Sequence, residues 1–162
     1  MLLFSHFIVT TVILLLAQKS GANLSPWIVF LCYLLGVFID LDHLIFHPKK
    51  SWLATKKFLS GGAKAERGKY YLHSYLQEPC FGVVILIITL LIFWRIKSGV
   101  IFLPVIALWL HILMDSIMKF DNLLLWPFSH RKFKGFLPSN SRFEYIISLI
   151  LSALILYAAF AR

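Results

Sequence analysis

Residues 26–47 read PWIVFLCYLLGVFIDLDHLIFH. The first part of this stretch is apolar and long enough to enter a lipid bilayer, but its end carries two aspartates and two histidines within residues 39–47. An ionisable side chain at the centre of a membrane costs roughly 2.5–3.5 kcal/mol, and such residues usually mark a functional site. The stretch therefore predicts a transmembrane helix with a functional site at its end.

The composition supports lipid as the surrounding solvent. Hydrophobic residues make up 60% of the 162 residues and charged residues only 14%, whereas soluble domains have about 25% charged residues. A spanning helix needs about 20 apolar residues. We predict an all-α, polytopic transmembrane helical bundle that forms one domain over residues 1–162. Its spans, about five in number, are expected near residues 2–17, 26–46, 80–94, 99–118 and 144–160.

The first apolar segment also raises the question of a signal peptide. Its start, Met1–His6, has no Lys or Arg, and a small-residue cleavage site is missing, so retention as a first span is favoured. The first and third segments are short. Four spans plus a half-buried helix is therefore the alternative count.

The basic residues predict the orientation of the bundle. The loops 47–79 and 119–143 contain seven and five of the 16 Lys and Arg residues, and the opposite side contains Lys19, Arg95 and two others. Cytoplasmic loops of membrane proteins carry the excess of Lys and Arg. We therefore expect the N-terminus and both long loops on the cytoplasmic side of the membrane.

Polar residues from four separate segments converge on that side. With these spans, the following residues lie at one depth near the cytoplasm: His6, Asp40, Asp42, His43, His73, His111 and Asp115. Carboxylates and imidazoles so close together need mutual compensation, which a divalent cation can supply because it binds both kinds of ligand. Zinc is the first expectation and manganese the second, with one or two ions.

Helical spacing supports this interpretation. His111 and Asp115 are four residues apart and Asp40 and His43 are three apart, so each pair shares one helix face. Asp42 points elsewhere and could be a general base or a partner that orients an imidazole. Two simpler interpretations stay open: a polar helix end whose side chains reach toward water, and hydrogen bonding between helices through His111 and Asp115.

The order of these motifs resembles the bacterial inner-membrane metal-dependent hydrolases, also called LexA-binding, inner-membrane-associated hydrolases. Short elements carry the resemblance over residues 1–136: His6, Asp40-Leu41-Asp42-His43, His73-Ser74, His111 to Asp115, and Trp126-Pro127-Phe128. Members of that family often have a further His five residues before the His-Ser element, where this sequence has Gly68. The family is itself distantly similar to the zinc-dependent phospholipase C and single-strand nuclease superfamily.

This distant similarity implies phosphoester hydrolysis at a zinc site in the bacterial inner membrane, and that location favours a lipid or membrane-associated substrate. The implied metal ligands are His6, Asp40, His43, His73, His111 and Asp115. A bound metal would make water acidic enough to act as a nucleophile at neutral pH. In that mechanism Asp42 and Asp115 are the candidate catalytic carboxylates, and Arg67 and Arg131 are candidates for holding a phosphate oxygen.

The sequence also bears on other functions. A non-enzymatic membrane adaptor would use a structural metal site and dock a cytoplasmic protein through its basic loops. A proton or metal transporter is disfavoured, because the spans lack deeper polar residues and internal repeats. The basic loops, including the Lys- and Trp-containing stretch 48–62, favour contact with membrane lipids over nucleic acid.

Overall fold

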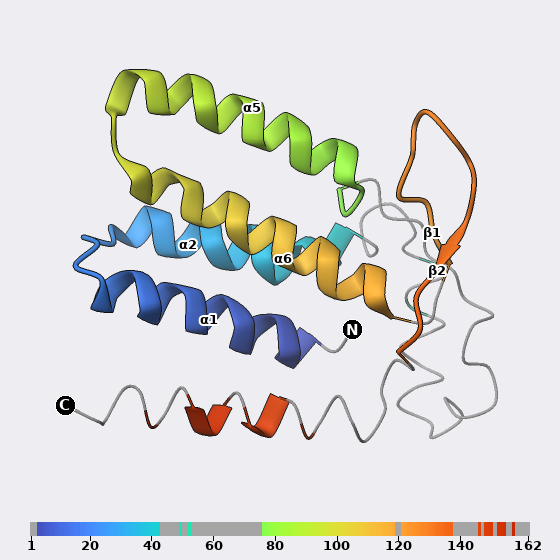
Figure 1. Ribbon diagram of the computed structural model, residues 1–162, viewed down its shortest axis with the longest axis horizontal. Coiled ribbons are helices and arrows are strands. Elements are labelled where there is room, and N and C mark those ends of the chain that lie inside the picture. Colours follow the sequence, from blue (N-terminus) through green and yellow to red (C-terminus); the bar gives the residue numbers. More distant parts are fainter. Residues whose placement is uncertain are drawn as a thin grey trace.

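The computed structural model describes residues 3–42, 49, 52, 76–118, 121–137, 146, 148–150, 152–154 and 157. The chain is mostly helical (Figure 1). Its helices are α1 (Leu3–Lys19), α2 (Pro26–Gly36), the short 3-10 helix η1 (Phe38–Leu41), α5 (Pro79–Ile96), the 3-10 helix η3 (Gly99–Phe102) and α6 (Leu103–Ile117). The strands β1 (Asp121–Asn122) and β2 (Phe133–Lys134) follow α6.

Local sequence signals begin and end these helices. α2 starts at Pro26, and the backbone N–H of Ile28 donates to the Ser25 side chain, 3.4 Å away. Proline is favoured in the first helical turn because its missing N–H would have no partner there. α1 is followed by Gly21 in the left-handed region, at φ +86°, where glycine has no steric penalty.

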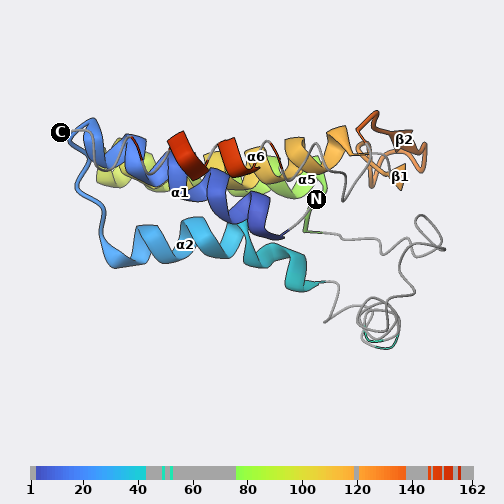
Figure 2. The same ribbon diagram turned by 90° about the horizontal axis from the view of Figure 1, so that it is seen from below.

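α6 is the centre of the bundle and contacts α1, α2 and α5. One buried cluster joins Leu14, Cys32 and Ala107, and a second joins Ile39, Leu108 and Ile112. α1, α5 and α6 lie in one layer, with α2 and η1 in a second layer against it (Figure 2). Both clusters include a residue of α6, so this helix holds the layers together.

Two helical segments are long and apolar enough to cross a membrane, residues 79–96 and 99–117, among the described parts of the chain. α1 and α2 are shorter apolar helices. α5 exposes large apolar side chains over much of its length, including Leu91 (68%). Contiguous exposed apolar surface of this extent is typical of contact with lipid.

The C-terminal apolar segment is described only in part. Its helical residues include Ser148, whose hydroxyl is buried and hydrogen-bonded to that of Ser5, 2.8 Å away. This contact places residue 148 beside the beginning of α1. The N-terminal ends of α1 and α5 and the C-terminal end of α6 lie at the same end of the bundle (Figure 1).

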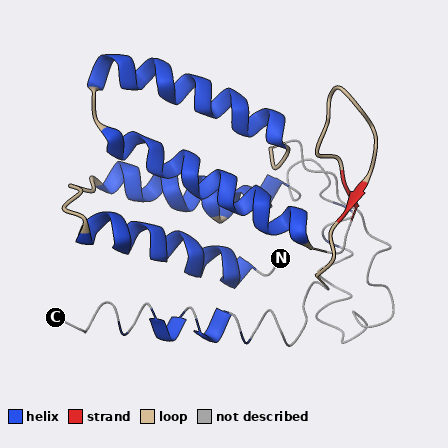
Figure 3. Cartoon of the chain, viewed as in Figure 1, coloured by secondary structure: helices blue, strands red, loops and turns tan. Residues whose placement is uncertain are grey.

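The structure differs from the expected helices in two places. The segment 26–46 was expected to be one span, but its α-helix ends at Gly36, and Val37 (φ −132°, ψ −58°) leads into η1. The loop 119–143 contains a small antiparallel hairpin, in which Asp121 pairs with Lys134 and Asn122 with Phe133 (Figure 3). An all-α prediction did not include these strands.

Candidate metal centre

α6 supplies two of the candidate ligands from one buried face. His111 and Asp115 lie one helical turn apart, and the shortest distance between His111 Nε2 and the Asp115 carboxylate is 3.4 Å, to Oδ2. The same face packs Leu108 and Ile112 into the core. Residues three and four apart share a helix face, so the apolar pattern that buries α6 also carries both polar side chains inward.

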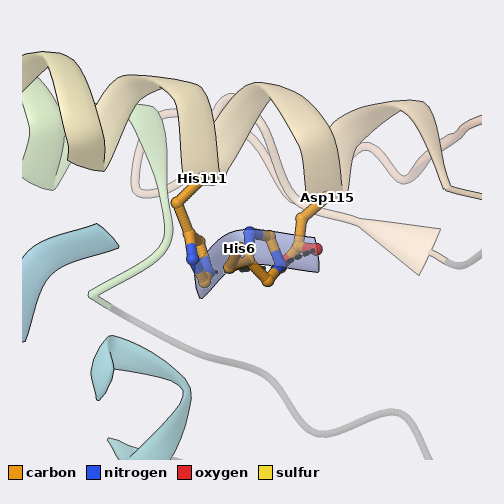
Figure 4. Close-up of side chains that lie close together, drawn as sticks. All are labelled: His6, His111 and Asp115. Carbon is orange, nitrogen blue, oxygen red and sulfur yellow. Dashed lines mark hydrogen bonds and ion pairs between the residues drawn. The ribbon is translucent and has the colours of Figure 1, made fainter. Parts of the chain in front are cut away.

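α1 brings His6 to the same point. Its imidazole stacks on that of His111, with ring centroids 3.9 Å apart and planes at 22°. His6 Nε2 lies 3.2 Å from Asp115 Oδ1. The Asp115 carboxylate therefore contacts both imidazoles, one through each oxygen (Figure 4).

η1 adds a second carboxylate. Asp40 Oδ1 lies 3.3 Å from His111 Nε2, and the Gln77 side-chain amide donates to the same oxygen at 2.7 Å. The Asp40 side chain is 23% exposed, compared with 11% for Asp115 and 0% for both histidines. Asp40 therefore forms the more accessible side of the cluster.

The break between α2 and η1 orients His111. His111 Nδ1–H donates to the backbone carbonyl of Gly36, 3.0 Å away. This carbonyl is accessible because the regular α-helical hydrogen bonding of α2 stops at Gly36. A hydrogen bond from one ring nitrogen to a backbone carbonyl fixes the tautomer of an imidazole. Nε2 therefore faces the two aspartates.

Gly36 also allows the helices to approach closely. A Cβ atom at this position would lie 2.5 Å from Thr10 Oγ1 and 3.0 Å from Ala107 Cβ. These atoms belong to α1 and α6, the two helices that carry His6 and His111. A larger residue at position 36 would force apart the elements that form the cluster.

The donor set fits a divalent cation. His6, His111 and Asp115 are all buried and each offers a ligand atom within 4.8 Å of the other two. Ligand atoms at about 2.0–2.1 Å from one tetrahedral ion lie about 3.3–3.4 Å apart. His6 Nε2 lies 3.2 Å from one Asp115 oxygen and His111 Nε2 lies 3.4 Å from the other, which is close to that spacing. Two aspartates would balance a dication, with neutral imidazoles as the other ligands.

One atom supports this interpretation most directly. His111 Nε2 is fully buried and has no hydrogen-bond partner of acceptable geometry among the described residues, although two carboxylate oxygens lie within 3.4 Å. Buried polar atoms are nearly always hydrogen-bonded or bound to a metal. A metal ion held by His6, His111 and Asp115, whose ligand atoms lie within 4.8 Å of one another, would give this nitrogen a partner.

Glu78 lies near this end of the bundle, immediately before α5 and outside the membrane-spanning helix. It is only 6% exposed. Burial raises the pKa of its carboxyl group to about 7, and a hydrogen bond from the backbone N–H of Leu123 limits the rise. The group is therefore poised to titrate near neutral pH.

The structure brings together four of the predicted site residues: His6, Asp40, His111 and Asp115. Asp42 is buried at the C-terminal end of η1, and Arg131 is exposed in the hairpin. The predicted ligands His43 and His73 and the predicted phosphate ligand Arg67 lie outside the described residues.

Sequence reasoning missed two contributors to the cluster. Gly36 acts through its backbone and its lack of a side chain, and Gln77 through a hydrogen bond to Asp40. A glycine within an apolar span was a signal for close helix packing. No local signal marked Gln77, because its partner lies 37 residues away in the sequence.

The sequence was compared with known protein families, curated proteins and solved structures. The family described as YdjM inner membrane protein matches residues 1–162. Neither a curated protein nor a solved structure matches the sequence.

Proposed function

The chain belongs to the YdjM inner membrane protein family, and from this premise we propose that it is a membrane-bound, metal-dependent hydrolase. The family and the apolar helices establish a membrane protein. The observation that carries the proposal is the buried convergence of His6, His111 and Asp115 on one point. A convergence of imidazole and carboxylate groups inside a membrane is costly and is usually retained for function.

The proposed topology has five spans and a cytoplasmic N-terminus. The excess of Lys and Arg in loops 47–79 and 119–143 supports this orientation, and the Ser5–Ser148 hydrogen bond supports a fifth helix beside α1. Five spans place the C-terminus outside. Alkaline phosphatase fused after Arg162 should therefore be active, whereas a fluorescent cytoplasmic reporter there would indicate four spans.

In the proposed centre His6, His111 and Asp115 hold the cation, for which zinc is the first candidate and manganese the second. When bound, such an ion lowers the pKa of water toward about 7 and polarises a phosphoryl oxygen. Both oxygens of Asp115 face imidazoles of the same cluster, which supports its proposed role as a ligand. Asp40 is more exposed and is oriented by Gln77, so it is the preferred general base, ahead of the buried Asp42.

The proposed reaction is hydrolysis of a phosphoester. Asp40 accepts a proton from the attacking water, a bond forms between the water oxygen and phosphorus, and the bond from phosphorus to the leaving oxygen breaks. The location favours a lipid phosphoester or another membrane-associated substrate. Arg131, exposed in the hairpin at this end of the bundle, and Arg67 are the proposed phosphate ligands.

Purified protein in detergent tests the proposal. Wild type should retain Zn²⁺ by elemental analysis and hydrolyse bis(p-nitrophenyl) phosphate with added Zn²⁺ or Mn²⁺. Asp40→Asn should keep the metal but lose about 10²–10⁴-fold in turnover, the usual contribution of a general base. His111→Ala should lose both the bound metal and the turnover. Ser116→Ala, which removes only a hydroxyl bonded to the Ile112 carbonyl, is the matched control. Turnover in His111→Ala equal to wild type would refute the mechanism.

The burial of the cluster favours a second candidate, a non-enzymatic adaptor with a structural metal. Structural zinc sites are closed by four protein ligands, and His6, His111, Asp115 and Asp40 could supply them. The basic loops would then dock a cytoplasmic protein. Two results would favour the adaptor. The wild type would bind metal without hydrolysing any phosphoester, and the Asp40→Asn variant would still bind the cytoplasmic partner protein.

A further inference from the structure

The hairpin formed by residues 121–137 exposes several large apolar side chains. Phe128 is 89% exposed and Phe136 is 77% exposed, and Leu125 and Phe133 are each more than half exposed. Clusters of exposed aromatic and aliphatic groups mark an interaction surface. The hairpin is therefore expected to meet something other than water.

The same hairpin is positively charged. Arg131, Lys132 and Lys134 are exposed, and Asp121 is the one acidic residue in the sequence 121–137. The cations alternate with aromatic residues along the sequence FSHRKFKGF, residues 128–136. Aromatic rings settle at the boundary between headgroups and acyl chains, while long basic side chains reach the headgroups.

The hairpin is fastened to the end of a membrane-spanning helix. The backbone N–H groups of Phe136 and Leu137 both donate to the Ile117 carbonyl at 3.0 Å. Gly135 is buried against this turn, where a Cβ atom would overlap the backbone of Ile117 and Met118. Because α6 belongs to a segment fit to span the membrane, these contacts hold the hairpin at the level where the bilayer ends.

We infer that the hairpin 121–137 is an interfacial anchor that binds the anionic lipid headgroups of the leaflet at the metal-centre end of the bundle. Phe128 and Phe136 enter the leaflet, and Arg131, Lys132 and Lys134 contact phosphate groups. A second copy of the chain is a poorer occupant, since two such hairpins would bring like charges together. The inference does not depend on hydrolysis and stands or falls separately from it.

Site-directed spin labelling tests the anchor in the full chain. Cys32 and Cys80 are replaced by Ala, and a single nitroxide is placed at Phe128→Cys, a side chain that makes little contact with the protein. Leu91→Cys on the lipid-exposed face of α5 is the acyl-chain reference, and Ser20→Cys, exposed after α1, is the aqueous reference. Collision rates with oxygen and with a water-soluble nickel chelate are measured in nanodiscs of phosphatidylcholine with phosphatidylglycerol, in phosphatidylcholine alone, and in detergent.

The expected result is a severalfold higher ratio of oxygen to nickel collisions at position 128 than at position 20 in the anionic nanodiscs. The ratio should fall in phosphatidylcholine alone and in the variant Arg131→Gln/Lys132→Gln/Lys134→Gln, which leaves the aromatic rings in place. Equal ratios at positions 128 and 20 would overturn the inference. The same ratio at position 128 in nanodiscs with and without phosphatidylglycerol would also overturn it. Exclusion of both reagents, in detergent as well as in lipid, would indicate a protein partner or second copy and would also overturn it.

Discussion

Gly36 connects the packing of the bundle to the orientation of its candidate metal ligand. Its carbonyl accepts from His111 Nδ1, and its missing side chain leaves space for Thr10 and Ala107. The first contact fixes which imidazole nitrogen faces the carboxylates. The second lets α1, which carries His6, approach α2 closely.

The substitution Gly36→Ala should therefore destabilise the protein and weaken metal retention together. Its Cβ would lie 2.5 Å from Thr10 Oγ1, and overpacking of this kind costs about 1–3 kcal/mol. Thermal unfolding in detergent and elemental analysis provide the two measurements. Adding Thr10→Ala to the variant should restore part of the stability and part of the metal retention, because it removes Oγ1, the atom nearest to the new Cβ.

Gly99→Ala is the matched control, since a Cβ at Gly99 meets nothing within 4 Å. It should leave both measurements unchanged. If Gly36→Ala behaves like Gly99→Ala, the close approach of the helices does not support the centre.

Glu78 predicts a pH dependence of stability. Its folded pKa is raised to about 7 from 4.5, so between these values the folded protein keeps a proton that the unfolded chain releases. The free energy of unfolding contributed by this group falls as pH rises through that window and is constant above it. The Glu78→Gln variant cannot ionise and should lack this decline. Unfolding temperatures of both proteins between pH 5 and 8 check this; parallel curves would contradict it.

At the scale of elements, composition and spacing predicted the helices well. The expected segments 80–94 and 99–118 correspond to α5 and to η3 with α6, and 2–17 corresponds to α1. Continuous apolar sequence bounded by polar loops is a strong signal for helices in lipid. The division of 26–46 at Gly36 was not predicted; the carbonyl that it exposes has its partner in His111, 75 residues away, which no local pattern indicates. The two-residue strands were too short to show an alternating pattern.

The hairpin 121–137 is attached to the end of α6 by close backbone packing at Gly135. Gly135→Ala should release the hairpin, because the added Cβ would meet backbone atoms of Ile117 and Met118 that cannot rotate away. Hydrogen exchange followed by mass spectrometry should show faster exchange of the Phe136 and Leu137 amides, which both donate to Ile117. The amides within α5 should be unaffected. Unchanged exchange at residues 136 and 137 would show that the hairpin tolerates the side chain.

At the scale of the whole molecule, the sequence could predict which end of the bundle holds the polar cluster but not its contacts. His6 and Asp115 could be assigned to one depth because each lies at a definable point in an apolar segment. Their 3.2 Å separation depends on how α1 rotates and packs against α6, which no local pattern specifies. Gln77 was missed for the same reason.

A cation that joins α1 to α6 through His6, His111 and Asp115 should stabilise the entire fold. A ligand at 100 times its dissociation constant adds about 2.7 kcal/mol to the free energy of unfolding. Removal of metal by a chelator should therefore lower the unfolding temperature of the wild type, and Zn²⁺ should restore it. His111→Ala should respond to neither treatment, while Ser116→Ala should respond as the wild type does. An unfolding temperature of wild type that is insensitive to chelation would argue against a bound metal.

The separation of His6 and Asp115 in the chain has a consequence for biogenesis. These two residues are 109 positions apart, and translation proceeds at about 5–20 residues per second. His6 therefore enters the membrane roughly 5–20 s before its carboxylate partner has been made. During that interval the nascent bundle holds an incomplete set of polar groups, and the cluster is completed only when α6 arrives.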